Sequence, residues 1–176
     1  LVSVFKAYDI RGIAGEELTP HFACKLGKSI VAHLNARCIA VARDIRESGP
    51  DLHDSFIKGV IVSGCDVMDL GITTTGVLYR ASKDLDVDVS VMITASHNPP
   101  EYNGFKICKG TLPMAGEELQ ELRETMERGD FIEGTGKLID AQEFQRQYIE
   151  TVIGNVGKPG RKIRVAIDCG NAVPGP

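Results

Sequence analysis

The apolar residues of this chain follow two spacings, one typical of helices and one of strands. An apolar residue recurs at every fourth position from Phe22 to Leu34, which predicts a helix with one buried face. Thr19 has the side chain of an N-cap, and Pro20 suits the first position of a helix. Residues 38–42 then form a short apolar run of the kind found in buried strands. The first predicted unit is therefore a helix followed by a strand.

The same pattern repeats further along the chain. Pro50 opens a second predicted helix, for which Gly64 is a candidate C-terminal cap, and residues 67–70 form the next predicted strand. A third helix is expected from about residue 75 to 85, before a strand of β-branched and apolar residues at 87–93. Strands that alternate with helices predict an α/β fold with a mostly parallel sheet.

The later elements break this alternation. Residues 105–108 are expected to form a strand that pairs antiparallel, with Asn103-Gly104 as the turn before it. Helices are predicted at 117–128 and around residues 144–152. A further strand is predicted at 163–167.

We expect the chain to contain one whole domain and part of another. Residues 1–137 are assigned to the first α/β domain, and residues 138–160 to a helix and an interdomain linker. Residues 161–176 are assigned to the start of a second α/β domain, because a strand and a turn cannot bury a core alone. The sequence is thus expected to be a fragment whose C-terminal domains are missing.

Composition and charge exclude several classes of protein. Hydrophobic residues make up 43% and charged residues 25%, which is the profile of a globular domain. The net charge of −4, without a run of Lys and Arg, argues against nucleic-acid binding. No segment approaches the roughly 18 apolar residues of a membrane span, so no membrane partner is expected. Five scattered cysteines, an odd number, favour the reducing cytoplasm.

Polar residues gather after two of the predicted strands. The charged cluster Arg43-Asp44-Ile45-Arg46-Glu47 follows the strand at 38–42, at the end of the sheet where open α/β folds bind ligands. The segment from 94 to 106, with the sequence TASHNPPEYNGFK, follows the strand at 87–93. It carries a hydroxyl, an imidazole, side-chain amides and a lysine, and its consecutive prolines stiffen it. A rigid polar loop on a sheet suits the holding of a reacting group.

This segment resembles the phosphoserine loop of the α-D-phosphohexomutases, and most of all that of the bacterial phosphomannomutase/phosphoglucomutase branch. Three further segments match the family in the same order. Tyr8-Asp9-Ile10-Arg11-Gly12 is similar to its amino-terminal arginine loop, Ala42-Arg43-Asp44-Ile45-Arg46 to its second strand end, and Asp168-Cys169-Gly170-Asn171 to the start of its second domain. The resemblance implies a three-layer α/β/α domain with a mixed, mostly parallel sheet, followed by the beginning of a second α/β domain.

The resemblance also implies a role for each site residue. Ser96 would carry the transferable phosphate, and the catalytic set is Ser96, His97, Lys106 and Arg11. The substrate and phosphate would be bound by Tyr8, Arg11, Asn98 and Lys106. The cluster of Arg43, Asp44 and Arg46 is expected to shape and brace the site and not to react.

The implied activity is that of an intramolecular phosphotransferase, an isomerase that interconverts hexose 1-phosphate and hexose 6-phosphate through a hexose 1,6-bisphosphate. One Mg²⁺ would bind the phosphate on Ser96 together with aspartates of a D-G-D-x-D loop, which this sequence lacks. The substrate is therefore expected to be a hexose phosphate, and the isolated fragment is expected to be inactive. The choice among glucose, mannose and glucosamine phosphates stays open.

Other functions are compatible with parts of the sequence. A phosphoglucosamine mutase-type relative and a non-catalytic α/β phosphate-binding module remain alternatives. A serine hydrolase is disfavoured because there is no G-x-S-x-G elbow and because His97 is expected to project away from Ser96. A dinucleotide-binding module is disfavoured because Arg11-Gly12-Ile13-Ala14-Gly15 stands where G-x-G-x-x-G would be needed.

Overall fold

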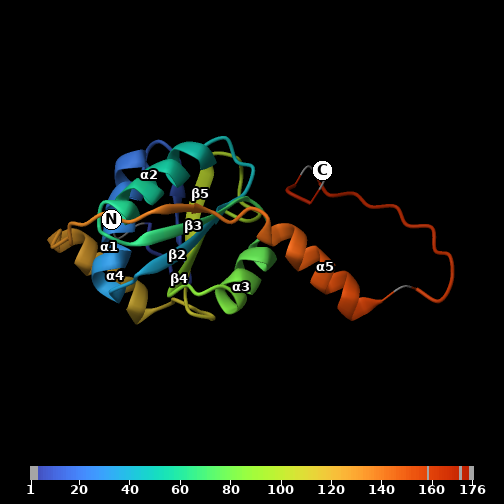
Figure 1. The fold of residues 1–176 in the computed structure, drawn as a ribbon. Helices are drawn as coiled ribbons and strands as arrows, with labels where there is room; N and C mark the ends of the chain where they lie inside the picture. Colours follow the sequence, from blue (N-terminus) through green and yellow to red (C-terminus); the bar gives the residue numbers. More distant parts are fainter. Residues whose placement is uncertain (1–3, 158, 171, 175–176) are drawn as a thin grey trace.

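The computed structural model describes residues 4–157, 159–170 and 172–174 of the chain (Figure 1). Its helices are α1 (Pro20–Leu34), α2 (Gly49–Ile61), α3 (Thr75–Asp84), α4 (Glu117–Arg128) and α5 (Phe144–Val156). Its strands are β1 (Ile10–Ile13), β2 (Cys38–Arg43), β3 (Asp66–Ile72), β4 (Val89–Ile93), β5 (Tyr102–Lys109), β6 (Leu112–Pro113) and β7 (Leu138–Asp140). Each predicted helix is present, and so is each strand predicted between residues 38 and 108.

The strands form one mixed sheet with the order β1-β5-β4-β2-β3-β7, and β6 pairs with β5. The pairs β2–β3, β2–β4 and β3–β7 are parallel, whereas β5 is antiparallel to β1, β4 and β6. Of the strands in the described residues, β5 alone therefore runs against the common direction. The mostly parallel sheet and the antiparallel pairing of the strand at 105–108 are both confirmed.

Helices cover both faces of this sheet (Figure 1). On one face, α1, α2 and α4 pack on a core that includes Ile39 and Val41 of β2. On the other face, α3 and the first turn of α5 pack on Ala40 and Ala42 of the same strand. This alternation is the two-residue period of a strand that is buried on both faces. The result is the expected three-layer α/β/α arrangement.

The order of the strands places a crevice between β2 and β4. The chain passes from β2 through α2 to β3 on one side, and then through α3 to β4 on the other side of β2. Ligands of open α/β sheets bind at such a reversal, at the carboxyl ends of the strands. Here those ends meet, because Arg43 pairs with Ile93 and the backbone N–H of Asp44 donates to the carbonyl of Ile93 at 3.1 Å. The two polar segments singled out from the sequence both start at this point.

The prediction of a turn at Asn103-Gly104 is wrong. Both residues lie inside β5, where Gly104 pairs with Arg11 of β1. A Cβ added at Gly104 would lie 2.4 Å from the carbonyl oxygen of Ile10 and 2.9 Å from that of Thr94. Glycine is thus required by the close approach of three backbone segments and not by a turn.

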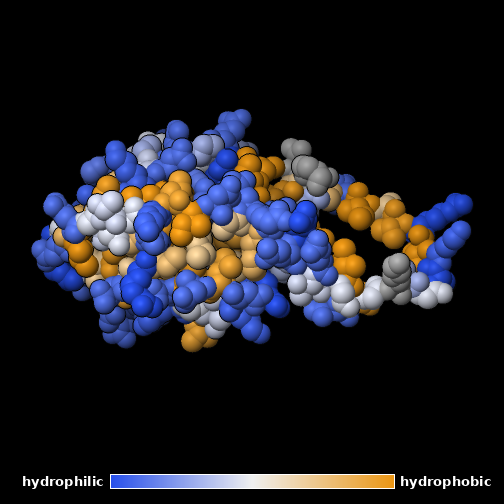
Figure 2. Space-filling model, in the orientation of Figure 1, coloured by the Kyte–Doolittle hydropathy of each residue, from blue (hydrophilic) through white to orange (hydrophobic). Residues whose placement is uncertain are grey.

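Two other local predictions also need correction. The helix α2 ends at Ile61 with Val62 as its C-cap, so Gly64 lies beyond the cap, in a left-handed conformation with φ of 84°. Residues 163–167 form no strand in the described part of the chain, and their apolar side chains are exposed. A strand needs a neighbour for its backbone hydrogen bonds, and no described strand lies beside this segment. Figure 2 shows apolar residues along this outlying part of the chain.

The sheet and its covering continue past residue 137, the predicted end of the first domain. The strand β7 pairs in parallel with β3, and Phe144 at the start of α5 is buried. Tyr148 is partly buried, whereas Val152 is exposed, so the predicted apolar face of α5 is covered only near its first turns. The domain boundaries themselves stay a prediction. Within the described residues, none of the helices has both the length and the apolar composition needed to cross a bilayer.

Candidate active site

The loop between β4 and β5 holds Ser96 in an unusual conformation. Ser96 has a φ of 58°, in the left-handed region that few residues other than glycine occupy. Its backbone N–H donates to the hydroxyl of Thr94 at 3.0 Å, and the N–H of Asn98 donates to the carbonyl of Ala95 at 3.1 Å. The side chain of Ser96 is exposed at the carboxyl end of β4. The loop thus presents a hydroxyl to solvent from a folded backbone.

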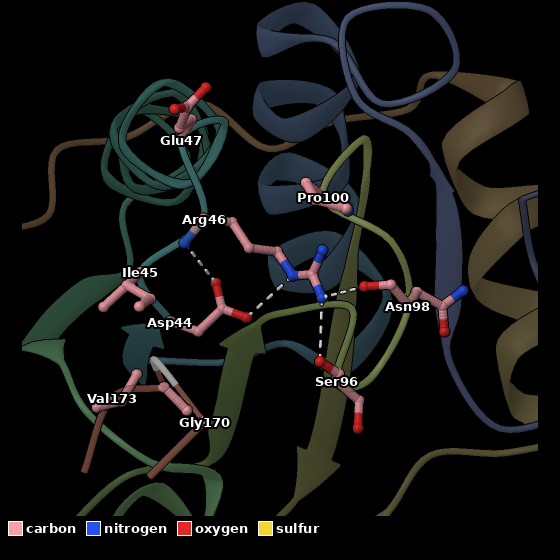
Figure 3. Close-up of a pocket in the computed structure, with 10 residues that line it drawn as sticks. Asp44, Ile45, Arg46, Glu47, Ser96, Asn98, Pro100, Gly170 and Val173 are labelled. Carbon is pink, nitrogen blue, oxygen red and sulfur yellow. Dashed lines mark hydrogen bonds and ion pairs between the residues drawn. The ribbon is translucent and has the colours of Figure 1, made fainter. Parts of the chain in front are cut away.

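The guanidinium of Arg46 holds this loop from the side of β2 (Figure 3). It donates to four backbone carbonyls, those of Ser96 (3.0 Å), Asn98 (2.8 Å), Pro99 (2.7 Å) and Tyr102 (2.9 Å). These acceptors lie 50 to 56 positions away in the sequence. Arg46 therefore braces the loop that carries Ser96, whereas its role in the reaction stays a prediction.

Asp44 joins Arg46 to the start of the loop. Its carboxylate accepts hydrogen bonds from Nε of Arg46 at 3.2 Å and from the hydroxyl of Thr94 at 2.6 Å. The Thr94 hydroxyl in turn accepts the backbone N–H of Ser96. The Ser96 peptide is therefore connected to β2 through both its N–H and its carbonyl oxygen.

A second group of charged residues lies on β1 and β5. The carboxylate of Asp9 accepts a hydrogen bond from the guanidinium of Arg11, and it accepts another from the ammonium of Lys106 at 3.0 Å. Arg11 also donates to the side-chain oxygen of Asn98 at 2.7 Å. The structure thus brings together Arg11, Lys106 and Asn98, three of the residues that the resemblance assigned to the site.

Asp9 is the member of this group that sequence reasoning missed. A carboxylate is an unfavourable neighbour for a phosphate, so its position beside Arg11 in the motif did not mark it as a site residue. No sequence signal marked it, because Asp9 meets Lys106 only through the antiparallel register that pairs Ile10 with Phe105. Arg11 itself lies inside the strand β1, whereas the resemblance to the family's arginine loop had implied a loop position.

His97 lies within reach of the serine hydroxyl. Its Nδ1 atom is 3.3 Å from Oγ of Ser96, and both side chains are exposed. The expectation that His97 projects away from Ser96 is therefore wrong, because the left-handed turn at Ser96 brings the adjacent side chains together. In the described part of the chain, no other group is hydrogen-bonded to the imidazole, so the third, orienting member of a hydrolase triad is not seen there.

The remaining candidate residues are arranged more loosely. Tyr8 is 78% exposed and takes no part in the described hydrogen bonds of the site. The described side-chain hydrogen bonds of Arg11 and Lys106 go to Asp9 and Asn98 and not to Ser96. Among the described residues, no three His, Cys, Asp or Glu side chains come together as a metal site.

An open cavity lies in front of the serine loop (Figure 3). Its volume is about 590 Å³, within the range of small-molecule sites. Ser96, Asn98 and Pro100 line one side, and residues 44–47 line another. Gly170, Ala172 and Val173 of the C-terminal segment complete the lining.

The fold and the site define an α/β/α domain that presents a serine hydroxyl at the switch point of its sheet, with a histidine and several cationic side chains nearby. Residues 2–133 match the family described as "Phosphoglucomutase/phosphomannomutase, alpha/beta/alpha domain I". The chain belongs to this family.

Individual relatives agree with this assignment. The chain is 40% identical over 176 residues to a phosphomannomutase/phosphoglucomutase of Pseudomonas aeruginosa, covering 98% of this chain and 38% of the relative. It is 35% identical over 174 residues to a probable phosphoglucosamine mutase of Methanopyrus kandleri, covering 95% of this chain and 38% of the relative. A crystal structure of a phosphoglucomutase/phosphomannomutase family protein from Burkholderia thailandensis superposes with a TM-score of 0.82 at 34% identity, covering 87% of this chain and 36% of that one. The chain thus spans well under half the length of the relatives it matches.

Proposed function

We propose that this chain supplies the phosphate-carrying serine of a phosphohexomutase that interconverts hexose 1-phosphate and hexose 6-phosphate. The observation that carries the proposal is the exposed hydroxyl of Ser96, 3.3 Å from the imidazole of His97 on a loop whose backbone is held from β2. A phosphoryl group bound at this hydroxyl would face the open cavity, where a sugar can approach it. Family membership and the sheet's switch point support the same assignment.

The proposed transfer balances in bonds and protons. The P–O bond to Oγ of Ser96 breaks as a P–O bond to a hydroxyl of the hexose monophosphate forms, which gives a hexose 1,6-bisphosphate. The proton lost by the sugar hydroxyl replaces the phosphoryl group on Oγ of Ser96. Among the described titratable groups, His97 is hydrogen-bonded to that oxygen and so can carry the proton. The bisphosphate then turns and returns its other phosphoryl group to Ser96. The net reaction is an isomerisation.

The cations on β1 and β5 suit the charge of this reaction. Negative charge on the transferring phosphoryl group is stabilised by fixed cations and hydrogen-bond donors. We propose that Arg11 and Lys106 supply such charge and that Asn98 and Tyr8 contact the phosphate or the substrate. In the structure, the carboxylate of Asp9 orients both cations and offsets the repulsion between them.

The cofactors follow from the family and not from this chain's own residues. A Mg²⁺ ion would bind an oxygen of the phosphate on Ser96, but the described residues form no further set of metal ligands beside it. We further propose that residues 1–176 alone do not turn over substrate, and that the protein works in the cytoplasm with hexose 1,6-bisphosphate as intermediate and activator.

The relatives point to two classes of sugar, neutral hexoses and an amino sugar. The relative from Pseudomonas aeruginosa is named for mannose and glucose phosphates, whereas that from Methanopyrus kandleri is named for glucosamine phosphate. Both match nearly the whole of this chain at similar identity. An activity comparison with the three hexose phosphates at the polypeptide's natural length will separate them.

Mass spectrometry of the protein at its natural length tests the central assignment. We expect phosphate on Ser96 in purified protein, or after incubation with glucose 1,6-bisphosphate. Ser55, a partly buried serine on α2, is the internal control and should carry none. Phosphate found reproducibly on another serine, with none on Ser96, would exclude the proposed role and would favour a non-catalytic phosphate-binding module.

A further inference from the structure

Arg46 differs from the other arginine of the site in how its donors are used. A guanidinium carries five N–H groups. In Arg46, Nε bonds Asp44, and the two terminal nitrogens make two bonds each to backbone carbonyls of the serine loop. In Arg11, by contrast, Nε is buried and is hydrogen-bonded to none of the described residues. Arg46 thus has no donor left with which to bind a phosphate, although it lines the same cavity as Ser96.

The acceptors of Arg46 lie before, within and after the two consecutive prolines, since one of them is the carbonyl of Pro99. Ser96 and Asn98 precede Pro99 and Pro100, whereas Tyr102 begins β5. One planar group therefore ties the reacting end of the loop to the strand that follows it. An ammonium on a flexible stem has three donors and cannot span this set, so lysine is not equivalent here.

The conformation of Ser96 depends on this network. Its carbonyl oxygen accepts from Arg46, and its N–H reaches Asp44 through the hydroxyl of Thr94. Both hydrogen-bonding groups of the peptide are therefore held while φ stays at 58°. A left-handed conformation persists in a residue other than glycine only where its surroundings enforce it.

We propose that Arg46 is a positioning residue, which fixes the direction of the Ser96 side chain by holding the carbonyls of its loop and does not itself contact the transferring phosphate. This inference rests on the proposed function of Ser96. Loss of Arg46 should misplace the phosphoryl donor while the groups that bind the sugar stay where they are. The rate of transfer falls under this proposal, and the affinity for substrate is largely retained.

The test compares Arg46→Ala and Arg46→Lys with wild type at the polypeptide's natural length. Arg123→Ala on α4 is the matched control, because Arg123 is similarly covered (18% exposed, against 12% for Arg46) but bonds Gln120 and Glu127 of its own helix. We expect kcat to fall by roughly 10²-fold in Arg46→Ala, the size of effect that a misplaced reacting group produces. KM should stay within a few-fold of wild type, and Arg123→Ala should keep wild-type kinetics.

Two further measurements separate positioning from general stability. Amide hydrogen exchange at Ser96, Asn98 and Tyr102 should accelerate in both Arg46 variants and not in Arg123→Ala. Added guanidinium ion should restore part of kcat to Arg46→Ala, whereas wild type and Arg123→Ala should not gain. Arg46→Lys keeps the charge and most of the packing, so it decides the question if Arg46→Ala does not fold.

The outcomes distinguish this proposal from that for Ser96. Unchanged exchange in the loop together with unchanged kcat in the Arg46 variants would overturn the positioning role. A large rise in KM at unchanged kcat would assign Arg46 to substrate binding and would also overturn it. A wild-type protein without phosphate on Ser96 would count against the proposed function, while the exchange data would still show whether Arg46 holds the loop.

Discussion

The ammonium group of Lys106 lies 3.0 Å from the carboxylate of Asp9, which stands 97 positions earlier in the chain. The same carboxylate oxygen accepts a hydrogen bond from Arg11. One acidic side chain thus orients two cations on neighbouring antiparallel strands. These cations lie at the edge of the site, where the proposed phosphate would be bound. The charges of this group are therefore part of the structure as well as of the proposed function.

Asp9→Asn should destabilise the domain while leaving its shape unchanged. The amide has the size of the carboxylate but no charge, so two partly buried cations lose their counterion. We expect the free energy of unfolding to fall by about 1–2 kcal/mol, since hydrogen bonds to charged groups are worth about that much at partly screened sites. Urea unfolding measures this. Asp84→Asn, which breaks the more exposed pair with Arg80, should cost under about 0.5 kcal/mol, and equal losses in the two variants would contradict the account.

Arg11→Ala should lower kcat by roughly 10²–10³-fold at the polypeptide's natural length, the usual cost of removing one donor from a charged transition state. Arg11→Lys should recover part of this, because the charge remains and the two-pronged contact is lost. Arg11 pairs with Asp9 and lies inside β1, so the free energy of unfolding should fall as well. The value of kcat must therefore be expressed per folded molecule. Near-normal kcat per folded molecule would make Arg11 a purely structural residue.

Substitution of Ser96 should reveal the cost of its left-handed backbone. Ser96→Gly should be more stable than Ser96→Ala by about 1 kcal/mol, because glycine adopts a φ of 58° without steric penalty. The same two changes at Ser55 of α2 should give the opposite order, since alanine is favoured inside helices. Chemical denaturation of the four variants measures both differences. Equal stability of Ser96→Gly and Ser96→Ala would show that the loop relaxes once the hydroxyl is gone.

The buried His53 should make stability depend on pH. Burial lowers the pKa of His53, but hydrogen bonds with Asp69 and Asp54 outweigh this and the net pKa is raised above 6.5. Burial raises the pKa of Asp69, yet its bonds with His53 and with the N–H of Gly71 lower it overall below 3.8. The ion pair therefore contributes its full stabilisation between pH 3.8 and pH 6.5, the ordinary pKa values of the two groups. This stabilisation is lost as pH rises through the raised pKa of His53, and also as pH falls through the lowered pKa of Asp69.

The measurement for this pair is the free energy of unfolding of wild type and His53→Gln between pH 5 and pH 9. The difference should be largest at the acidic end of this range and should shrink as pH rises through the pKa of His53 in the folded state. The matched control is His21→Gln, the same substitution at an exposed histidine on α1. A His53→Gln difference that grows with rising pH would reverse the assigned sign.

Sequence pattern alone located the helices and the central strands, because their signals are local. The N-cap at Thr19 and the apolar spacing through Leu34 act within a few turns of one helix, and α1 is found with that cap and those bounds. The buried strands β2 and β4 are marked by their own composition. The motif around Ser96 was likewise readable, since the residues of the loop are contiguous.

What only the tertiary structure decided involves contacts between distant segments. The strands β1 and β7 are short, and they become strands because β5 and β3 offer them hydrogen-bonding partners. Gly104 looked like a turn residue, and its real constraint is the carbonyl of Ile10 on another strand. The contacts of Arg46 are with backbone carbonyls, which every residue possesses, so no sequence pattern marks them. The sequence determined which side chains the site contains, whereas folding decided which of them touch Ser96, because those contacts depend on how the strand ends meet.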